Sequence, residues 1–138
     1  MKADLAAALP NAVVAEFITE VMTHESLQRY AKASGDLNPL HLDPAFARQA
    51  GFDDVIVHGM LGMAALGRLL TEHFPASTIR TFNARFGAII PVNRALHCRA
   101  LLDQRGDTLL TLTLEARIAG TDTIAVSGNA SIALGASD

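Results

Sequence analysis

An aspartate and a histidine, Asp36 and His41, stand five residues apart in one short segment of this chain. A carboxylate and an imidazole that share one water molecule can act as a general acid/base pair. Pro39 disfavours helical geometry at Asn38, so both side chains lie on a loop that can curl them towards one point. The alternative is a turn in which Asp36 caps Asn38 and His41 is exposed. Spacing alone favours this turn, because Asp and His are common in loops.

The segments on both sides of this loop are predicted to be helices. Residues 24–34 follow a helical apolar pattern that Gly35 ends, and residues 44–49 form a short helix that begins at a proline. Residues 59–74 are the strongest helical run, and apolar side chains surround most of it, which is typical of a buried helix. The loop therefore lies between two helices and ahead of a third, buried one.

The second half of the chain alternates between apolar and polar residues instead. This pattern predicts antiparallel strands with one solvated face. They lie at residues 78–88, 95–103, 108–118 and 124–134, with an earlier strand at residues 13–19. A sheet that wraps around the apolar helix buries both the helix and the apolar face of the sheet. The predicted fold class is therefore α+β, and residues 1–138 are expected to form a single domain.

Composition argues against several classes of function. The chain of 138 residues has a net charge of −3 and no basic stripe, so no nucleic-acid partner is expected. Its single cysteine, Cys98, excludes an internal disulfide, and its five histidines lack the carboxylate spacing of a metal site. No apolar run is long enough to span a membrane, and no convincing signal peptide is present. We therefore expect a cytoplasmic protein with neither a metal nor a membrane partner.

Two motifs at a fixed separation carry a family resemblance. The segment GDLNPLH at residues 35–41, followed by IVHGML at residues 56–61, resembles the signature of the MaoC-type (R)-specific enoyl-CoA hydratases and 3-hydroxyacyl-thioester dehydratases. The resemblance covers roughly residues 25–92, and the later strands agree with it by pattern. It implies a hot-dog fold, in which an antiparallel sheet wraps around the long helix at about residues 59–74.

The resemblance also implies an activity and a set of site residues. The expected reaction is the reversible hydration of trans-2-enoyl thioesters to (R)-3-hydroxyacyl thioesters by a water held between Asp36 and His41. We favour His41 as the base and Asp36 as the acid, although a coupled pair allows either assignment. The backbone N–H of Gly59, at the start of the buried helix, is the implied oxyanion donor.

Further expectations concern what binds at the site. Asn38, His58 and Met60 are implied to lie at the substrate, although Asn38 equally suits an ordinary turn before a proline. The substrate is expected to be an acyl-CoA or acyl-carrier-protein thioester of fatty acid metabolism. No cofactor is expected beyond the CoA or phosphopantetheine that forms part of this substrate.

One position departs from the resemblance. Some (R)-hydratases carry a serine on the central helix eight residues after the oxyanion glycine, where this chain has Gly67. Gly67 and Gly62 either leave room for an acyl chain beside the helix or allow the helix to pack closely on the sheet. The length of the acyl chain and the nature of its carrier stay open.

Two other functions stay open beside hydration. A hot-dog acyl-CoA thioesterase usually needs an acidic or amide residue on or near the central helix, and Glu72 is the only carboxylate there, near the far end. The other alternative is the catalytic subunit of a heterodimeric 3-hydroxyacyl-acyl-carrier-protein dehydratase. Edge-to-edge pairing of two sheets removes exposed strand edges, so a homodimer is expected, with a heterodimer as the second choice.

Overall fold

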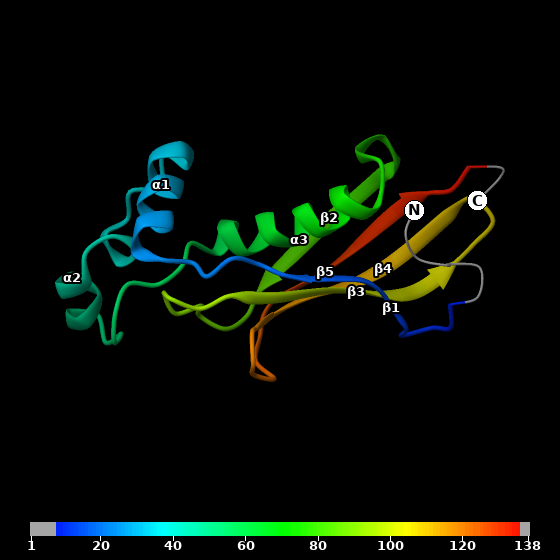
Figure 1. Cartoon of the computed structure of the whole chain (residues 1–138). Helices are drawn as coiled ribbons and strands as arrows, with labels where there is room; N and C mark the ends of the chain where they lie inside the picture. Colours follow the sequence, from blue (N-terminus) through cyan, green and yellow to red (C-terminus); the bar gives the residue numbers. More distant parts are fainter. Residues whose placement is uncertain (1–7, 136–138) are drawn as a thin grey trace.

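The computed structural model describes residues 8–135, which form one antiparallel sheet and a set of helices (Figure 1). The elements are β1 Val13–Ile18, α1 His24–Ser34, η1 Pro39–His41, α2 Pro44–Gln49, α3 Gly59–His73, η2 Ala76–Thr78, β2 Ile79–Phe86, β3 Leu96–Arg105, β4 Leu109–Ile118 and β5 Ile124–Ala133. The predicted α+β class is confirmed, and every predicted helix and strand is present. The short 3-10 helices η1 and η2 were not predicted. The expectation that residues 1–138 are a single domain stays a prediction.

The sheet has the strand order β1-β3-β4-β5-β2, so β1 and β2 are its edges. The pairs β3–β4 and β4–β5 are antiparallel neighbours, with Ala100 opposite Leu114 and Leu114 opposite Gly128. The predicted alternation is confirmed most clearly on β3 and β4, whose buried side chains are Leu96, Cys98, Ala100, Leu102, Leu110, Leu112, Leu114, Ala116 and Ile118. These residues form the apolar face against which the long helix packs.

Helix α3 lies along that apolar face of the sheet (Figure 1). Leu66, Leu69 and Leu70 are fully buried there and join one continuous core with the inward residues of the strands. The prediction that this helix is buried is wrong for one stripe, because Met60 is 56% exposed and Ala64 is also exposed. Among the described residues, no helix combines the length and the hydropathy needed to cross a membrane.

Two glycines of α3 differ in how closely the sheet approaches them. A Cβ placed on Gly62 would lie 2.9 Å from Val126 Cγ2 and 3.2 Å from Ile90 Cδ1, which is closer than normal packing allows. A Cβ on Gly67 would meet only Phe82 Cε2, at an ordinary 3.5 Å. Gly62 therefore serves close packing of the helix on the sheet, and the space beside Gly67 is bounded by Phe82.

The helices α1, η1 and α2 form a lobe, residues 24–49, that lies beyond one end of the sheet (Figure 1). Two isolated antiparallel bridges connect the flanks of this helical lobe to the segment before β3. They pair Met22 with Arg94 and Ile56 with Pro91. Leu27 and Ala47 of the helical lobe are fully buried and belong to the same core as α3. The helical lobe is thus fixed to the body of the protein rather than tethered to it.

Candidate active site

The loop between α1 and α2 is shaped by its own side chains. Gly35 ends α1 in the left-handed region, with φ of 80°, and donates its N–H to the carbonyl of Ala31. The side-chain oxygen of Asn38 then accepts the N–H of Leu40 at 3.0 Å and starts η1. Asp43 caps α2 by accepting the N–H groups of two residues that follow it. These local hydrogen bonds fix the path of the loop before any contact with the sheet is considered.

Asp36 and His41 come together on this loop. Their Oδ2 and Nε2 atoms lie 3.8 Å apart, too far for a direct hydrogen bond but close enough to share one hydrogen-bonded group. The other carboxylate oxygen of Asp36 accepts the N–H of Asn38 at 3.3 Å, so the predicted turn is present as well. The alternative in which His41 is merely exposed is wrong, because its side chain is only 11% exposed, against 51% for Asp36.

The orientation of the His41 ring is fixed from the opposite side. Its Nδ1 lies 2.7 Å from the backbone carbonyl oxygen of Ile56. A carbonyl can only accept a hydrogen bond, so Nδ1 carries the hydrogen and the neutral ring keeps its lone pair on Nε2. That lone pair is on the nitrogen nearer the carboxylate of Asp36. The geometry therefore presents His41 as a base whose free nitrogen is next to a carboxyl group.

His58 lies directly behind this pair. Its ring stacks on that of His41 with centroids 3.9 Å apart and planes inclined by 21°, and Tyr30 of α1 meets it edge-on at 4.8 Å. Its Nε2 is 3.2 Å from the backbone oxygen of Asp36, and its Nδ1 is buried with no hydrogen-bond partner among the described residues. Burial lowers the pKa of His58, as does the neighbouring His41, which favours the neutral ring.

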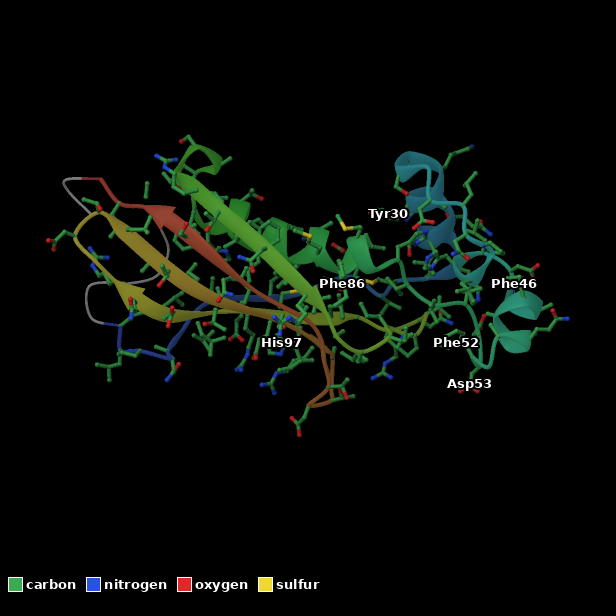
Figure 2. All side chains as sticks on the ribbon, turned by 180° about the vertical axis from the view of Figure 1, so that it is seen from behind. Tyr30, Phe46, Phe52, Asp53, Phe86 and His97 are labelled. Atoms are coloured by element: carbon green, nitrogen blue, oxygen red, sulfur yellow. The ribbon has the colours of Figure 1, made fainter. Side chains whose placement is uncertain are left out.

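Gly59 follows His58 and opens α3. The N-cap residue of this helix makes no side-chain cap, and the N–H groups of Gly59 and Met60 have no hydrogen-bond partner among the described residues. Free N–H groups at a helix start, with the helix dipole behind them, stabilise negative charge. The side chain of Phe86 covers the other side of Gly59, where a Cβ would lie 3.3 Å from its ring. In Figure 2, Phe86 lies at the end of β2 nearest the helical lobe.

Three of these residues also form the one cluster, in the described part of the chain, of side chains that could together bind a metal ion. Single atoms of Asp36, His41 and His58 lie within 4.8 Å of one another. The two imidazole rings are stacked almost parallel, and each nitrogen lone pair lies in the plane of its own ring, so the lone pairs of the two rings lie in separate, nearly parallel planes. Both rings therefore cannot aim a nitrogen at one ion, and the cluster suits proton transfer better than metal binding.

The structure thus brings most of the expected site residues to one place. Asp36, His41 and His58 are in mutual contact, and Gly59 is next to them in the chain. The side chain of Asn38 shapes the loop instead of pointing at the pair, and that of Met60 is largely exposed beside the helix start. Two partners were not foreseen from the sequence, the carbonyl of Ile56 and the ring of Tyr30. No sequence signal could have identified the first, because every residue carries a carbonyl.

Comparisons with known proteins identify the family of the chain. Residues 7–118 match the family described as MaoC like domain. A mitochondrial 3-hydroxyacyl-[acyl-carrier-protein] dehydratase of Arabidopsis thaliana is 39% identical over 94 residues, which are 68% of this chain and 49% of that protein. The chain thus spans about half the length of this relative, and 10% of a peroxisomal hydratase-dehydrogenase-epimerase of Neurospora crassa.

Solved structures give the same fold. The (R)-hydratase of Aeromonas caviae that is involved in PHA biosynthesis superposes with a TM-score of 0.80 at 28% identity, covering 94% of this chain and 98% of that one. An R-hydratase of Pseudomonas aeruginosa reaches 0.79 at 24% identity, over 92% and 82% of the two chains. The second likeness concerns the fold alone. The hot-dog fold expected from the two motifs is thereby confirmed.

Proposed function

Because the chain belongs to the MaoC-like dehydratase family, we propose that it is a hydro-lyase that adds water to trans-2-enoyl thioesters and removes it from (R)-3-hydroxyacyl thioesters. The observation that carries this proposal is the opposed pair of Asp36 and His41, whose Oδ2 and Nε2 atoms are 3.8 Å apart. A gap of this width accommodates one water molecule that both groups contact. The substrate is an acyl group on CoA or on an acyl carrier protein.

In the hydration direction, the pair holds one proton, on Asp36, and His41 is neutral. Nε2 of His41 takes a proton from the water as its oxygen bonds to the β-carbon, and Asp36 gives its proton to the α-carbon. The carbon–carbon π bond is lost, and one C–O and one C–H bond form. The proton now on His41 then returns to Asp36 through the next water molecule that enters the 3.8 Å gap, which restores the pair. The fixed Nδ1–H of His41 supports its assignment as the base.

Negative charge moves onto the thioester oxygen as the new bonds form. We assign the free N–H of Gly59 as its hydrogen-bond donor, with the dipole of α3 adding to the effect. A glycine here leaves the approach to the N–H open, because the ring of Phe86 already occupies one side. Gly59→Ala is expected to lower kcat/KM about 10²-fold, since a displacement of about 1 Å at a reacting group has that effect.

A control for this variant must separate the effect on the Gly59 N–H from the displacement of the Phe86 ring. Phe86 is 51% exposed, so its ring can turn away from an added methyl group. Gly59→Ala is therefore expected to keep its melting temperature. If Gly59→Ala with Phe86→Ala recovered full activity, displacement of the Phe86 ring would explain the loss, and the direct role of the Gly59 N–H would be contradicted.

The central experiment follows the loss of enoyl absorbance with crotonyl-CoA. Asp36→Asn and His41→Gln are each expected to lower kcat by about 10²–10⁴-fold, the usual contribution of general acid/base catalysis. Asp53→Asn and His97→Gln are matched controls: Asp53 is exposed beyond α2, and His97 pairs with Glu16 on β1 (Figure 2). Near-normal rates in either site variant would defeat the assignment of the pair.

A thiol assay run on the same samples separates hydration from thioester hydrolysis. Thiol release without hydration would indicate the thioesterase alternative. The structure gives little support to a thioesterase. Glu72 lies near the end of α3 that is far from Gly59, and its carboxylate pairs with Arg68, with Oε1 of Glu72 2.9 Å from Nε of Arg68. Its carboxylate is therefore occupied on the surface of the protein and cannot serve as a nucleophile at the site.

We further propose that two copies of the chain join through the β2 edges of their sheets. One side of β2 pairs with β5 and its other side is open. Exposed apolar side chains stand at the end of this strand and at the start of α3: Phe86 packs beside Gly59, Met60 is the next residue along α3, and Ile89 follows Phe86 by three residues. Such a patch beside a site favours a covering partner. Light scattering of an active sample should give twice the mass of one chain; a monomeric active sample would contradict this, and activity that requires a second protein would favour the heterodimer.

A further inference from the structure

His58 is the most deeply buried polar side chain of the site, at 1% exposure. A substrate cannot reach a side chain that is enclosed to this extent, so contact with the thioester is not its role. It touches the site residues themselves: the ring of His41, the backbone of Asp36 and, through the chain, Gly59. We propose that His58 is a positioning residue, which as a neutral Nε2–H tautomer holds the acid and the base of the pair in register. This inference rests on the proposed function.

The tautomer follows from the acceptor. Nε2 of His58 lies 3.2 Å from the backbone oxygen of Asp36, which can only accept a hydrogen bond. The hydrogen must therefore be on Nε2, which leaves Nδ1 as a bare lone pair in a buried position. Protonating Nδ1 would place an N–H there with no acceptor among the described residues, and this is costly in a buried site. The enclosure thus selects one protonation state of the ring.

This hydrogen bond holds the acid. Asp36 is half exposed, and the hydrogen bond that its carboxylate accepts from the described residues is a local one, from the N–H of Asn38. Its backbone is the part that is anchored to the body of the protein, through the Nε2–H of His58. Loss of that donor frees the loop at the residue whose carboxylate must meet the substrate.

The stacking contact holds the base. His41 is fixed in its plane by the hydrogen bond from Nδ1 to Ile56, but one hydrogen bond leaves the ring free to tilt about that axis. The ring of His58, 3.9 Å away and inclined by only 21°, blocks that tilt on one face. Both constraints together direct Nε2 of His41 at the gap before Asp36.

The charge of His58 matters to the same contact. His41 becomes a cation each time it takes a proton, and a second cation stacked on it would oppose that step. The groups that face His58 are Tyr30, which brings no charge, His41 and Asp36. Burial and the neighbouring His41 lower the pKa of His58 against the opposing effect of Asp36, so the ring stays neutral beside its partner. A neutral stacked ring supports the imidazolium of His41 without competing for its proton.

Two variants separate the two contacts. His58→Gln keeps a side-chain N–H donor and loses the stacked ring, whereas His58→Phe keeps the ring and loses the donor. We expect each to lower kcat about 10–10²-fold, the scale of a small misplacement of catalytic groups, with KM changed less than threefold. His97→Gln, which lies outside the site and pairs with Glu16, is the control and should retain the wild-type rate. Combining His58→Gln with Asp36→Asn should be no worse than Asp36→Asn alone, because His58 acts through the pair.

Three results would overturn the proposal. A raised KM with unchanged kcat would make His58 a substrate-binding residue. A lowered melting temperature with an unchanged rate would make it merely structural. Nitrogen-15 NMR of the imidazole rings in the wild-type protein gives a reading without turnover: we expect His58 to be neutral at neutral pH, with its hydrogen on Nε2. Hydrogen on Nδ1, or a cationic ring at neutral pH, would refute the proposal.

The same set of measurements separates the two proposals. If the wild-type protein hydrates no enoyl thioester, the proposed function fails, and the NMR reading still decides whether His58 holds the geometry described here. If the wild-type protein is active and His58→Gln and His58→Phe match its kcat, the positioning role fails and the hydratase function stands. Should His58→Phe not fold, His58→Gln and the NMR reading decide the question.

Discussion

Alanine substitutions at Gly62 and Gly67 should move the stability of the protein in opposite directions. Both glycines lie within α3, five residues apart, so both variants gain the same helix propensity, about 1 kcal/mol per glycine replaced. They differ in what the new methyl group meets. At Gly67 it makes an ordinary 3.5 Å contact with Phe82, so Gly67→Ala should stabilise the fold by up to about 1 kcal/mol.

At Gly62 the methyl group has no room. It would lie 2.9 Å from Val126 and 3.2 Å from Ile90, and both of these side chains are almost completely buried, so neither can turn out into solvent. Overpacking of this kind costs about 1–3 kcal/mol. After the gain in propensity, Gly62→Ala should lose up to about 2 kcal/mol. The two variants should then differ by about 1–3 kcal/mol, which for a chain of this size is a difference in Tm of roughly 3–10 °C.

Thermal unfolding and urea unfolding at one fixed protein concentration measure this difference, and the fixed concentration removes any contribution from association. The unfolding slope in urea should be the same in both variants, because the surface exposed on unfolding is unchanged. Equal stability of Gly62→Ala and Gly67→Ala would refute the reasoning. It would mean that α3 can move away from the sheet at Gly62 at no cost, and that the close packing described there does not hold the helix in place.

Three further predictions concern the sheet. Gly128→Ala should destabilise the protein by more than about 3 kcal/mol in urea unfolding, because its Cβ would overlap the backbone oxygen of Asn83 and β2 would have to separate from β5. Wild-type stability of this variant would contradict the close approach of the two strands. Burial raises the pKa of Glu115, but hydrogen bonds and positive charge from Arg99 and Arg117 have a larger opposite effect, so the pKa is lowered. The Glu115→Gln variant should therefore be less stable than the wild-type protein at pH 7. This difference in the free energy of unfolding should shrink as the pH falls below 4.5 and through the lowered pKa, whereas a difference that does not change with pH would exclude the ion pair as its cause. Burial raises the pKa of the Cys98 thiol to about 12, so a disulfide reagent at pH 8 should modify only the unfolded protein, and rapid reaction of the folded protein would contradict the burial of Cys98.

The sequence predicted the sheet well because its central strands obey a simple pattern. β3 and β4 have one buried face and one solvated face, and their alternation can be read directly from the chain. The pattern is weakest on β2, where Phe82 and Ala84 are only half-buried and Phe86 is 51% exposed. A strand at the sheet edge ends beyond the core, and alternation carries no information on where the core stops.

The site was predicted in its residue types and only partly in its geometry. The spacing of Asp36 and His41 allowed both an ordinary turn and an acid/base pair, and the structure contains the turn and the pair together. The reason is that the two oxygens of Asp36 have different partners. The stacking of His41 on His58 could not be predicted, because it depends on how the helical lobe meets the start of α3. Local patterns contain no information on such long-range contacts.

The unequal exposure of the two paired groups has a consequence for turnover. Asp36 is 51% exposed, while His41 is 11% exposed, so the carboxylate exchanges protons directly with bulk water and the imidazole is shielded from it. The proton that His41 takes from the water leaves through the gap and Asp36, so no further internal chain of proton carriers is needed between one substrate and the next. A bound substrate that covered Asp36 would isolate the pair from solvent for the duration of the chemical step.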